Sequence, residues 1–204
     1  MSDAAFWDRA APKYARDPIS DMDGYRHTLG RMREILQPDH RVLEVGCGTG
    51  STALELAPGV ASYVATDVSP RMIEIARAKL TPDMPADLRF EVGRAGTLPP
   101  GDFDAVLALN LLHLLPHLES DLRRIHDKLP RGGLFIAKTG LLKEGAWFLR
   151  PMITIMRLLG KAPFVRRLSE SELKGILDST GFDVIETYRQ EGMAPRIFTV
   201  GRKR

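Results

Sequence analysis

The sequence predicts an α/β fold in which a doubly wound, largely parallel sheet carries helices on both faces. Short apolar runs alternate with amphipathic stretches over most of the chain, a pattern typical of strand-helix-strand units. Near the end, two apolar runs follow one another with no helix between them. Such a pair forms a hairpin, so we expect the last strand to be antiparallel to its neighbour.

The length and composition limit the class of protein. A chain of 204 residues is long enough for a single domain with its own core. Because Cys47 is the only cysteine, we expect no internal disulfide, no metal site rich in cysteine and a reducing compartment. The first ten residues show no apolar run of a secretory signal, and no stretch reaches the roughly 18 apolar residues of a membrane-spanning helix. These features predict a cytoplasmic protein, and no metal site is predicted.

Residues 1–37 are predicted to form an α-helical cap. Aromatic and alanine side chains, including Trp7 and Tyr14, recur at helical spacing over residues 4–14 and mark a first helix. After an Asp-Pro break, apolar residues at three- and four-residue intervals mark a second helix that ends before Pro38.

Residues 38–140 carry the regular alternation and are predicted to form the core that binds a ligand. Ser69 followed by Pro70 is a strong start for a helix, because serine caps free N–H groups and proline suits the first turn. The predicted strands are Arg41–Val45, Ser62–Thr66, Leu88–Val92, Phe103–Leu109 and Leu134–Lys138. The predicted helices are Thr49–Ala57, Pro70–Leu80 and Leu118–Leu129.

Residues 141–168 break the alternation and are predicted to form an inserted helical lid. Apolar side chains are interspersed there with six Lys and Arg residues, and residues 141–204 together hold 12 basic against 7 acidic side chains. The lid could pack on the N-terminal helices, cover an apolar acceptor or lie on an anionic membrane. A merely solvated basic surface is the remaining alternative.

Residues 169–204 are predicted to form the last helix and a β-hairpin. Ser169 and Glu172 have the spacing of a capping box, and Gly181 suits the end of the helix. Strands at Phe182–Tyr188 and Arg196–Gly201 bring the predicted sheet to seven strands.

The most informative segment is Val42–Gly50, in which a buried strand runs into three glycines at alternating positions. Gly46, Gly48 and Gly50 let the backbone turn tightly and let a ligand approach without a Cβ in the way. Ligands of open α/β sheets bind beyond the carboxyl ends of the strands, where this loop lies.

The spacing of the loop excludes two nucleotide-binding motifs. A dinucleotide fingerprint needs glycine or alanine at position 51, which is Ser51 here, and a P-loop needs a lysine that the loop lacks. An acidic residue, Glu44, stands instead two positions before the first glycine.

With this loop the chain resembles the class I S-adenosylmethionine-dependent methyltransferases, and most of all their small-molecule branch, which includes enzymes of ubiquinone and menaquinone biosynthesis. Residues 103–110 resemble the fourth strand of that family, and residues 129–135 resemble its Pro-Gly turn before the fifth. The resemblance implies a Rossmann-like fold and S-adenosyl-L-methionine as cofactor.

Asp67 supports the same interpretation, because it ends the second predicted strand where an acidic group meets ribose in adenosine-binding folds. A carboxylate accepts two hydrogen bonds from a cis-diol. The alternative is an aspartate that caps the next helix, a role that Ser69 already fills.

The resemblance implies the remaining cofactor contacts. Tyr14 and Tyr25 correspond to positions that close over the cofactor in relatives, with plain packing as the alternative. The implied cofactor-binding residues are Tyr14, Glu44, Gly46, Cys47, Gly48, Gly50, Asp67, Val68, Met72, Arg94, Ala95, Asn110 and Leu111.

Arg94 departs from the family pattern. Relatives carry Gly-Asp-Ala after the third strand, where the aspartate accepts a hydrogen bond from the adenine amino group, whereas this chain has Gly-Arg-Ala. Arginine has no acceptor. Three alternatives stay open: the Ala95 backbone alone contacts adenine, Arg94 stacks on the ring, or cofactor binding is weak or lost.

Methyl transfer depends mainly on alignment and needs a base only when the acceptor is protonated. His113, just beyond the fourth predicted strand, is the candidate catalytic residue, as a base or an orienting group, and a structural histidine is the alternative. His117 and His126 lie in the next helix and are expected at the surface.

Nucleic-acid methylation is not expected. Residues 110–113 do not form the Asn/Asp-Pro-Pro-aromatic motif of amino methyltransferases, and Cys47 lies inside the glycine loop rather than where a thiolate nucleophile would be needed. No basic stripe interleaved with aromatic residues appears.

The sequence therefore predicts a methyltransferase that acts on a small hydrophobic or amphiphilic acceptor, by in-line displacement and with no nucleic-acid partner. The alternative is a binding or regulatory protein of the same fold with a degenerate cofactor site. Peripheral membrane contact stays open, as does the choice between monomer and homodimer.

Overall fold

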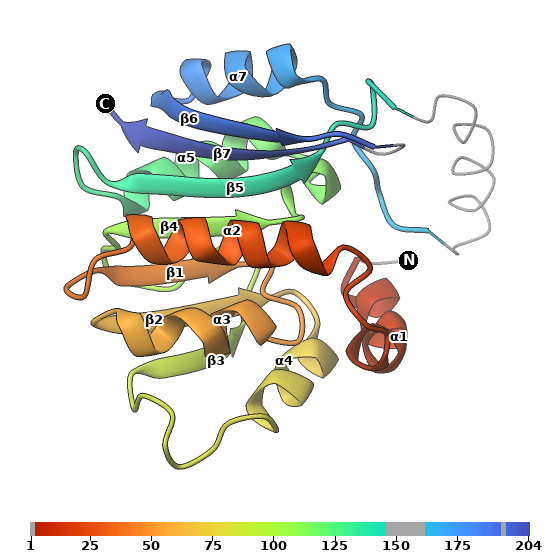
Figure 1. Ribbon diagram of the computed structural model, residues 1–204, viewed down its shortest axis with the longest axis vertical. Helices are drawn as coiled ribbons and strands as arrows, with labels where there is room; N and C mark the ends of the chain where they lie inside the picture. The colour runs from red at the N-terminus through yellow and green to blue at the C-terminus, as the bar shows by residue number, and fades with distance from the viewer. Residues whose placement is uncertain (1–2, 146–161, 193–194) are drawn as a thin grey trace.

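A computed structural model describes residues 3–145, 162–192 and 195–204. Its centre is a seven-stranded sheet with the order β3-β2-β1-β4-β5-β7-β6, in which β7 runs antiparallel to both β5 and β6 and the other neighbours are parallel (Figure 1). The predicted sheet with its antiparallel last strand is confirmed. The strands are β1 (Arg41–Val45), β2 (Ser62–Asp67), β3 (Leu88–Val92), β4 (Ala105–Leu109), β5 (Leu134–Gly140), β6 (Phe182–Gln190) and β7 (Arg196–Lys203).

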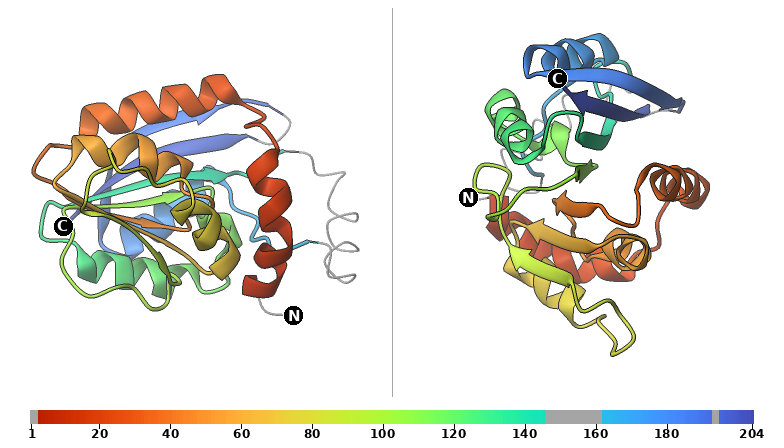
Figure 2. Two further views of the ribbon diagram at one scale, coloured as in Figure 1. Left: turned by 90° about the horizontal axis from the view of Figure 1, so that it is seen from below. Right: turned by 90° about the vertical axis from the view of Figure 1, so that its left-hand side faces the viewer.

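Helices cover both faces of the sheet (Figures 1 and 2). One apolar cluster lies under α5 and α7, and a second lies under α2, α3 and α4. The α-helices are α1 (Asp3–Arg16), α2 (Met22–Ile35), α3 (Ser51–Leu56), α4 (Pro70–Arg77), α5 (Leu118–Lys128) and α7 (Glu170–Ser179), and the 3-10 helices are η1 (Ala57–Gly59) and η2 (Leu112–Leu114).

The elements differ from the predicted boundaries by a few residues, for local reasons. The helix predicted from Thr49 begins at Ser51, because Gly50 at its N-cap has φ 77° and cannot belong to a right-handed helix. The helix predicted to reach Leu80 ends at Arg77, because the N–H groups of Lys79 and Leu80 donate to the third residue back rather than the fourth.

The two N-terminal helices occupy different places. α1 packs against α4 beyond the carboxyl ends of the strands, whereas α2 lies on a face of the sheet near α3 (Figure 1). A buried lysine holds α2 there: Nζ of Lys138 donates to the carbonyl oxygen of Gly24 at 3.1 Å and to Oγ1 of Thr28 at 3.0 Å. Of these two helices, α1 is the one that lies at the carboxyl ends of the strands, where it can cover a ligand.

Most of the predicted lid, residues 146–161, lies outside the described residues. The described ends of that segment, residues 141–145 and 162–168, form turns and extended chain without a helix. Among the described helices, none is long and apolar enough to cross a membrane.

Candidate functional site

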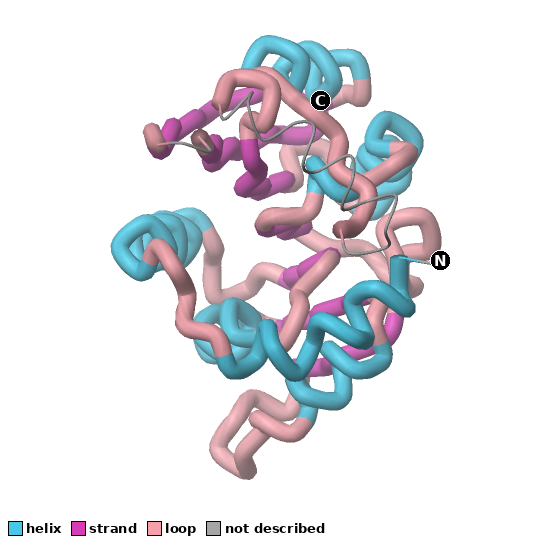
Figure 3. Tube along the Cα trace, turned by 90° about the vertical axis from the view of Figure 1, so that its right-hand side faces the viewer, coloured by secondary structure: helices cyan, strands magenta, loops and turns pink. Residues whose placement is uncertain are grey.

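A cavity of about 840 Å³ opens at the carboxyl ends of the parallel strands. Its wall comes from the loop after β1, the ends of β2 and β4, the turn after β3, α1 and the first turns of α5. Pro163 and Phe164, at the described end of the inserted segment, complete it. Figure 3 shows the molecule from this side.

The three glycines after β1 have left-handed backbone but different surroundings. Their φ angles are 76°, 55° and 77° at Gly46, Gly48 and Gly50. A Cβ on Gly46 would lie 2.8 Å from Leu111, and one on Gly50 would lie 2.6 Å from the Phe90 ring, so these two glycines permit close packing. A Cβ on Gly48 would lie 3.6 Å from its nearest neighbour, and Gly48 lines the cavity. The approach of a ligand to bare backbone therefore concerns Gly48 above all.

Asp67 ends β2 with its carboxylate held by backbone. Oδ2 accepts a hydrogen bond from the Gly48 N–H at 2.9 Å, and Oδ1 accepts one from the Ser69 N–H at 2.9 Å. Burial raises the pKa of Asp67, and these N–H groups oppose the shift. The orientation of the carboxylate is thus fixed, and each oxygen keeps a second lone pair for a hydroxyl in the cavity.

The turn after β3 adjoins Asp67. The Gly93 N–H donates to the Asp67 carbonyl oxygen at 2.9 Å, and the Thr97 N–H donates to the Arg94 carbonyl oxygen at 2.8 Å. Ala95 is buried and the Arg94 side chain is exposed, and both line the cavity. Within the described part of the chain Arg94 has no side-chain hydrogen bond or ion pair, so nothing described fixes its guanidinium.

The loop after β4 contains the only described non-glycine residue with positive φ, Asn110 at 56°. Its N–H donates to the carbonyl oxygen of Lys138 at 2.6 Å, which continues the pairing of β4 with β5. Asparagine tolerates left-handed backbone better than most residues. The turn brings Asn110 and Leu111 into the cavity wall.

His113 follows in η2 and contacts the end of β5. Its Nδ1 lies 2.9 Å from Oγ1 of Thr139, and its carbonyl oxygen accepts a hydrogen bond from the Arg166 N–H at 2.6 Å. Burial lowers the pKa of His113 to about 4, with a smaller contribution from Arg196. The imidazole is therefore neutral at physiological pH, and the contact with Thr139 leaves Nε2 for a ligand.

One face of α1 closes the opposite side of the cavity. Trp7 and Tyr14, two helical turns apart, both line it. The helix is attached to α4 through Asp8, which accepts hydrogen bonds from Oγ of Ser69 at 2.6 Å and from the Arg71 N–H at 3.1 Å.

Most of the predicted site is brought together at this cavity. The predicted residues that line it are Tyr14, Gly46, Gly48, Asp67, Val68, Met72, Arg94, Ala95, Asn110, Leu111 and His113.

Four residues named from the sequence lie behind the wall instead. Glu44 is buried on the face of the sheet that α2 and α3 cover, where it accepts a hydrogen bond from Tyr63 Oη at 2.9 Å, and burial raises its pKa to about 7. Burial also raises the pKa of Cys47, so the thiol stays protonated. Gly50 packs under the loop, and Tyr25 packs against the apolar cluster under α2.

Sequence reasoning missed several cavity residues. Trp7 lies on the same face of the first predicted helix as Tyr14, so the helical spacing could have identified it as a cavity residue. Asp121 lies on the apolar stripe of α5 formed by Leu118 and Leu122, which is an unusual place for a carboxylate. Phe164 lies in the segment predicted to form the lid, whose apolar side chains were the signal that it could cover an acceptor. His117, expected at the surface, is exposed and also lines the cavity.

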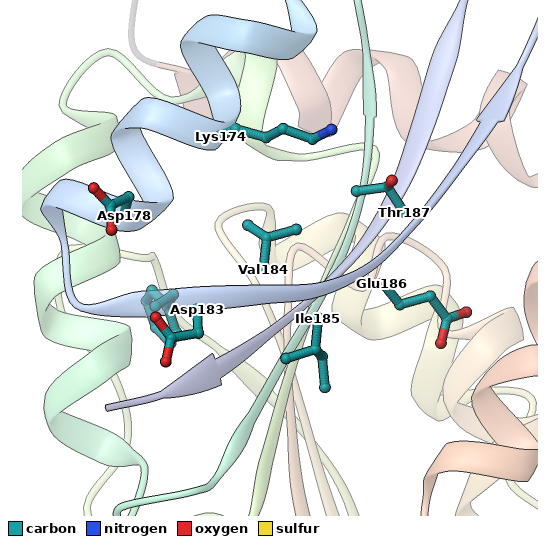
Figure 4. Close-up of a pocket in the computed structure, with 8 residues that line it drawn as sticks. Lys174, Asp178, Asp183, Val184, Ile185, Glu186 and Thr187 are labelled. Carbon is teal, nitrogen blue, oxygen red and sulfur yellow. The ribbon is translucent and has the colours of Figure 1, made fainter.

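A second hollow of about 460 Å³ lies between α7 and the edge strand β6 (Figure 4). Its charged groups are neutralised within the fold: Arg204 pairs with Asp178 and Asp183, and Glu186 pairs with Arg31. It lies away from the glycine loop and offers no comparable binding chemistry. In residues 3–145, 162–192 and 195–204, no group of three His, Cys, Asp or Glu side chains could hold a metal ion.

Comparison with known proteins agrees with this geometry. Residues 42–133 match a methyltransferase domain family. This match confirms the resemblance to the class I S-adenosylmethionine-dependent methyltransferases that the glycine loop predicted. A magnesium-protoporphyrin O-methyltransferase of Rhodobacter capsulatus is 43% identical over 121 residues, which cover 52% of this chain and 54% of that protein. The match thus spans about half the length of this relative.

Longer matches exist at lower identity. An uncharacterized methyltransferase of Synechocystis is 29% identical over 170 residues, covering 81% of this chain and 77% of that protein. The crystal structure of magnesium protoporphyrin IX methyltransferase from Synechocystis, with bound SAH (S-adenosylhomocysteine), superposes with a TM-score of 0.74 at 18% identity and covers 99% of this chain and 96% of that one. At this identity the superposition supports the shared fold.

Proposed function

We propose that this protein transfers a methyl group from S-adenosyl-L-methionine to a small hydrophobic or amphiphilic acceptor by in-line displacement. The observation that carries the proposal is the placement of Gly48 and Asp67 side by side in one cavity wall, joined by a 2.9 Å hydrogen bond. Gly48 offers a backbone surface without a Cβ, and Asp67 beside it offers a carboxylate of fixed orientation.

The residues present fit the cofactor. A carboxylate with free lone pairs suits the ribose diol, and the bare backbone at Gly48 suits close approach of the chain that carries the sulfur. The Ala95 N–H and the apolar side chains of Val68 and Leu111 suit the adenine ring. When bound, S-adenosylmethionine supplies an activated methyl group on a positively charged sulfur.

The protein contributes alignment and proton handling. The walls formed by α1 and the loop after β4 hold the acceptor in line with the methyl group and exclude water, which can supply most of the rate. The acceptor's lone pair forms the new bond to carbon as the bond between carbon and sulfur breaks. If the acceptor atom carries a proton, neutral His113 accepts it at Nε2 and passes it to water.

The acceptor class is inferred from the wall beyond the cofactor residues. Trp7, Leu114, Leu115 and Phe164 make it largely apolar, while His113 and Asn110 provide hydrogen-bonding groups. An apolar wall with few polar groups suits a hydrophobic or amphiphilic molecule. The relative that methylates magnesium protoporphyrin supports an acceptor of this kind.

Calorimetric titration with S-adenosylmethionine and SAH tests the proposal. We expect both to bind, and the absence of binding would exclude the function. Asp67→Ala should weaken binding about 10- to 100-fold, as for a lost hydrogen bond of a charged group. Asp39→Ala, an exposed aspartate before β1, should leave affinity unchanged.

The alternative, a binding or regulatory protein with a degenerate cofactor site, is favoured by Arg94. Because arginine cannot accept a hydrogen bond from adenine, Arg94→Asp discriminates between the two. A large gain in affinity for SAH would support the degenerate site. An unchanged affinity would support a site that functions with arginine.

Contact with a membrane has weaker support in the described residues. Most described cations of the C-terminal third are paired, including Arg166 with Glu119 and Lys174 with Glu170. Binding to anionic vesicles that decreases with salt would support a membrane-bound acceptor. Its absence would leave a soluble acceptor.

A further inference from the structure

Asp121 is a carboxylate on the buried side of α5. Leu118, Leu122 and Ile125 form the apolar stripe of this helix, and Asp121 shares their face with only 7% of its surface exposed. Carboxylates are rarely buried to this extent unless they are paired.

The hydrogen bonding of Asp121 within the fold is weak. The side-chain contact is with Nη1 of Arg124, one helical turn on, at 3.3 Å, and half of that arginine's surface is exposed. Burial raises the pKa of Asp121, and the neighbouring Arg124 and His117 oppose the shift only in part. A buried carboxylate with one long hydrogen bond has unused acceptor capacity.

The carboxylate lies over the turn after β3. A Cβ on Gly96 would be 3.6 Å from Oδ1 of Asp121, and both residues line the main cavity. The same turn is hydrogen-bonded through Gly93 to the end of β2, where Asp67 would hold the ribose. With the ribose on Asp67, a base that lay along this turn would reach Gly96 and Asp121, which line the same cavity.

The turn itself provides no anionic acceptor. Its side chains are those of Arg94, Ala95 and Thr97, of which arginine and alanine accept no hydrogen bond. Two described carboxylates of the cavity wall lie near this turn: Asp67, at its Gly93 end, is assigned to the ribose, and Asp121 lies beside Gly96.

On the basis of the proposed function, we propose that Asp121 accepts a hydrogen bond from the exocyclic amino group of adenine and thereby selects a 6-amino over a 6-oxo purine. The amino group is a donor, which suits a carboxylate, whereas a 6-oxo group would bring two acceptors together. α5 would then provide the contact that the arginine at position 94 cannot make.

The test compares SAH with its deaminated analogue, S-inosylhomocysteine, by isothermal titration calorimetry. The wild-type protein should bind SAH on the order of 10- to 100-fold more tightly. Asp121→Asn should lose most of this preference, because an amide can donate to the 6-oxo group. Asp127→Asn, an exposed position on the same helix, should keep it.

Asparagine has nearly the shape of aspartate and removes a buried charge, so the variant should fold, as circular dichroism can check. Asp121→Ser provides a second variant that should also lose the preference. If either folded variant keeps the wild-type ratio of affinities, the role of Asp121 is excluded while the proposed function stands. If the wild-type protein binds neither compound, both are excluded.

Discussion

Between β1 and β3 the cavity wall is held by backbone hydrogen bonds, whereas beyond β4 it is formed by residues from separate elements. The first part rests on Gly48, the turn at Gly93 and one carboxylate, Asp67, all joined by hydrogen bonds within adjacent strands. The second part brings Trp7 from α1 and Phe164 from the inserted segment to one place. A shared cofactor needs a constant shape, and fixed backbone supplies it, while side chains on separate elements let the acceptor differ among proteins of one fold.

The largest expected effect on stability comes from a change at Gly50, which packs under the backbone part of the wall. Gly50→Ala should lower the free energy of unfolding by about 2 to 5 kcal/mol, because left-handed backbone costs alanine 1–2 kcal/mol and the Cβ also meets the buried Phe90 ring. Urea denaturation measures the change. Gly48→Ala is the matched control, since it carries the same backbone cost without the clash. Equal losses in the two variants would contradict the distinction drawn between these glycines.

Glu44, behind the same wall, should make stability depend on pH. Its folded pKa of about 7 lies above the ordinary 4.5, so its contribution is fully present below pH 4.5 and is lost as the pH rises through 7. Glu44→Gln removes this loss, so its stability relative to wild type should rise by on the order of 3 kcal/mol between pH 4.5 and pH 8. Thermal denaturation across this range measures it.

The matched control is Glu55→Gln, a half-exposed glutamate on α3. The difference in stability between Glu55→Gln and the wild-type protein should stay nearly constant with pH. A constant difference for Glu44→Gln as well would show that Glu44 keeps its ordinary pKa in the folded protein, contrary to its burial.

His113, in the side-chain part of the wall, should titrate in the opposite sense. Its folded pKa of about 4 lies below the ordinary 6.5, so its contribution to stability is present above pH 6.5 and is lost as the pH falls toward 4. NMR titration of the histidine ring protons should give His113 a midpoint near 4. A midpoint near 6.5 would mean that the imidazole is solvated rather than buried beside Thr139.

The smallest expected effect concerns the attachment of α1. Asp8→Ala removes the hydrogen bonds from Ser69 and Arg71, so α1 should detach more readily and affinity for SAH should fall about fivefold, as for one ordinary hydrogen bond. Limited proteolysis should cut residues 3–16 faster in this variant. Asp17→Ala, at an exposed ion pair with Lys13, should change neither measurement.

The sequence predicted the backbone part of the site better than the side-chain part, for a physical reason. Gly46 to Gly50 and Asp67 act through local backbone geometry at strand ends, which short patterns encode. Trp7, Asp121 and Phe164 meet only through tertiary packing, and no local pattern states which elements become neighbours. Glu44 and Cys47 were predicted to bind the cofactor because they belong to the glycine-loop motif, but they lie behind the cavity wall. A residue can therefore belong to a binding motif without lining the cavity.

The prediction of the fold was likewise better where local patterns decide the structure than where tertiary contacts do. Hydrophobic alternation predicted the seven strands and the hairpin, because each strand buries its side chains against helices in a regular way. The residues at which helices and strands begin and end could not be predicted from hydrophobic alternation. The start of α3, for example, is set by the left-handed backbone of Gly50. The continuation of β5 to Gly140 depends on its partner Arg196, which is 56 positions away in the chain.

The most direct test of the central claim is a crystal structure with SAH at saturating concentration. We predict the ribose hydroxyls on the carboxylate of Asp67, the amino-acid chain over Gly48 and the adenine along the turn from Gly93 to Gly96. An empty cavity, or a ribose bound away from Asp67, would contradict the account.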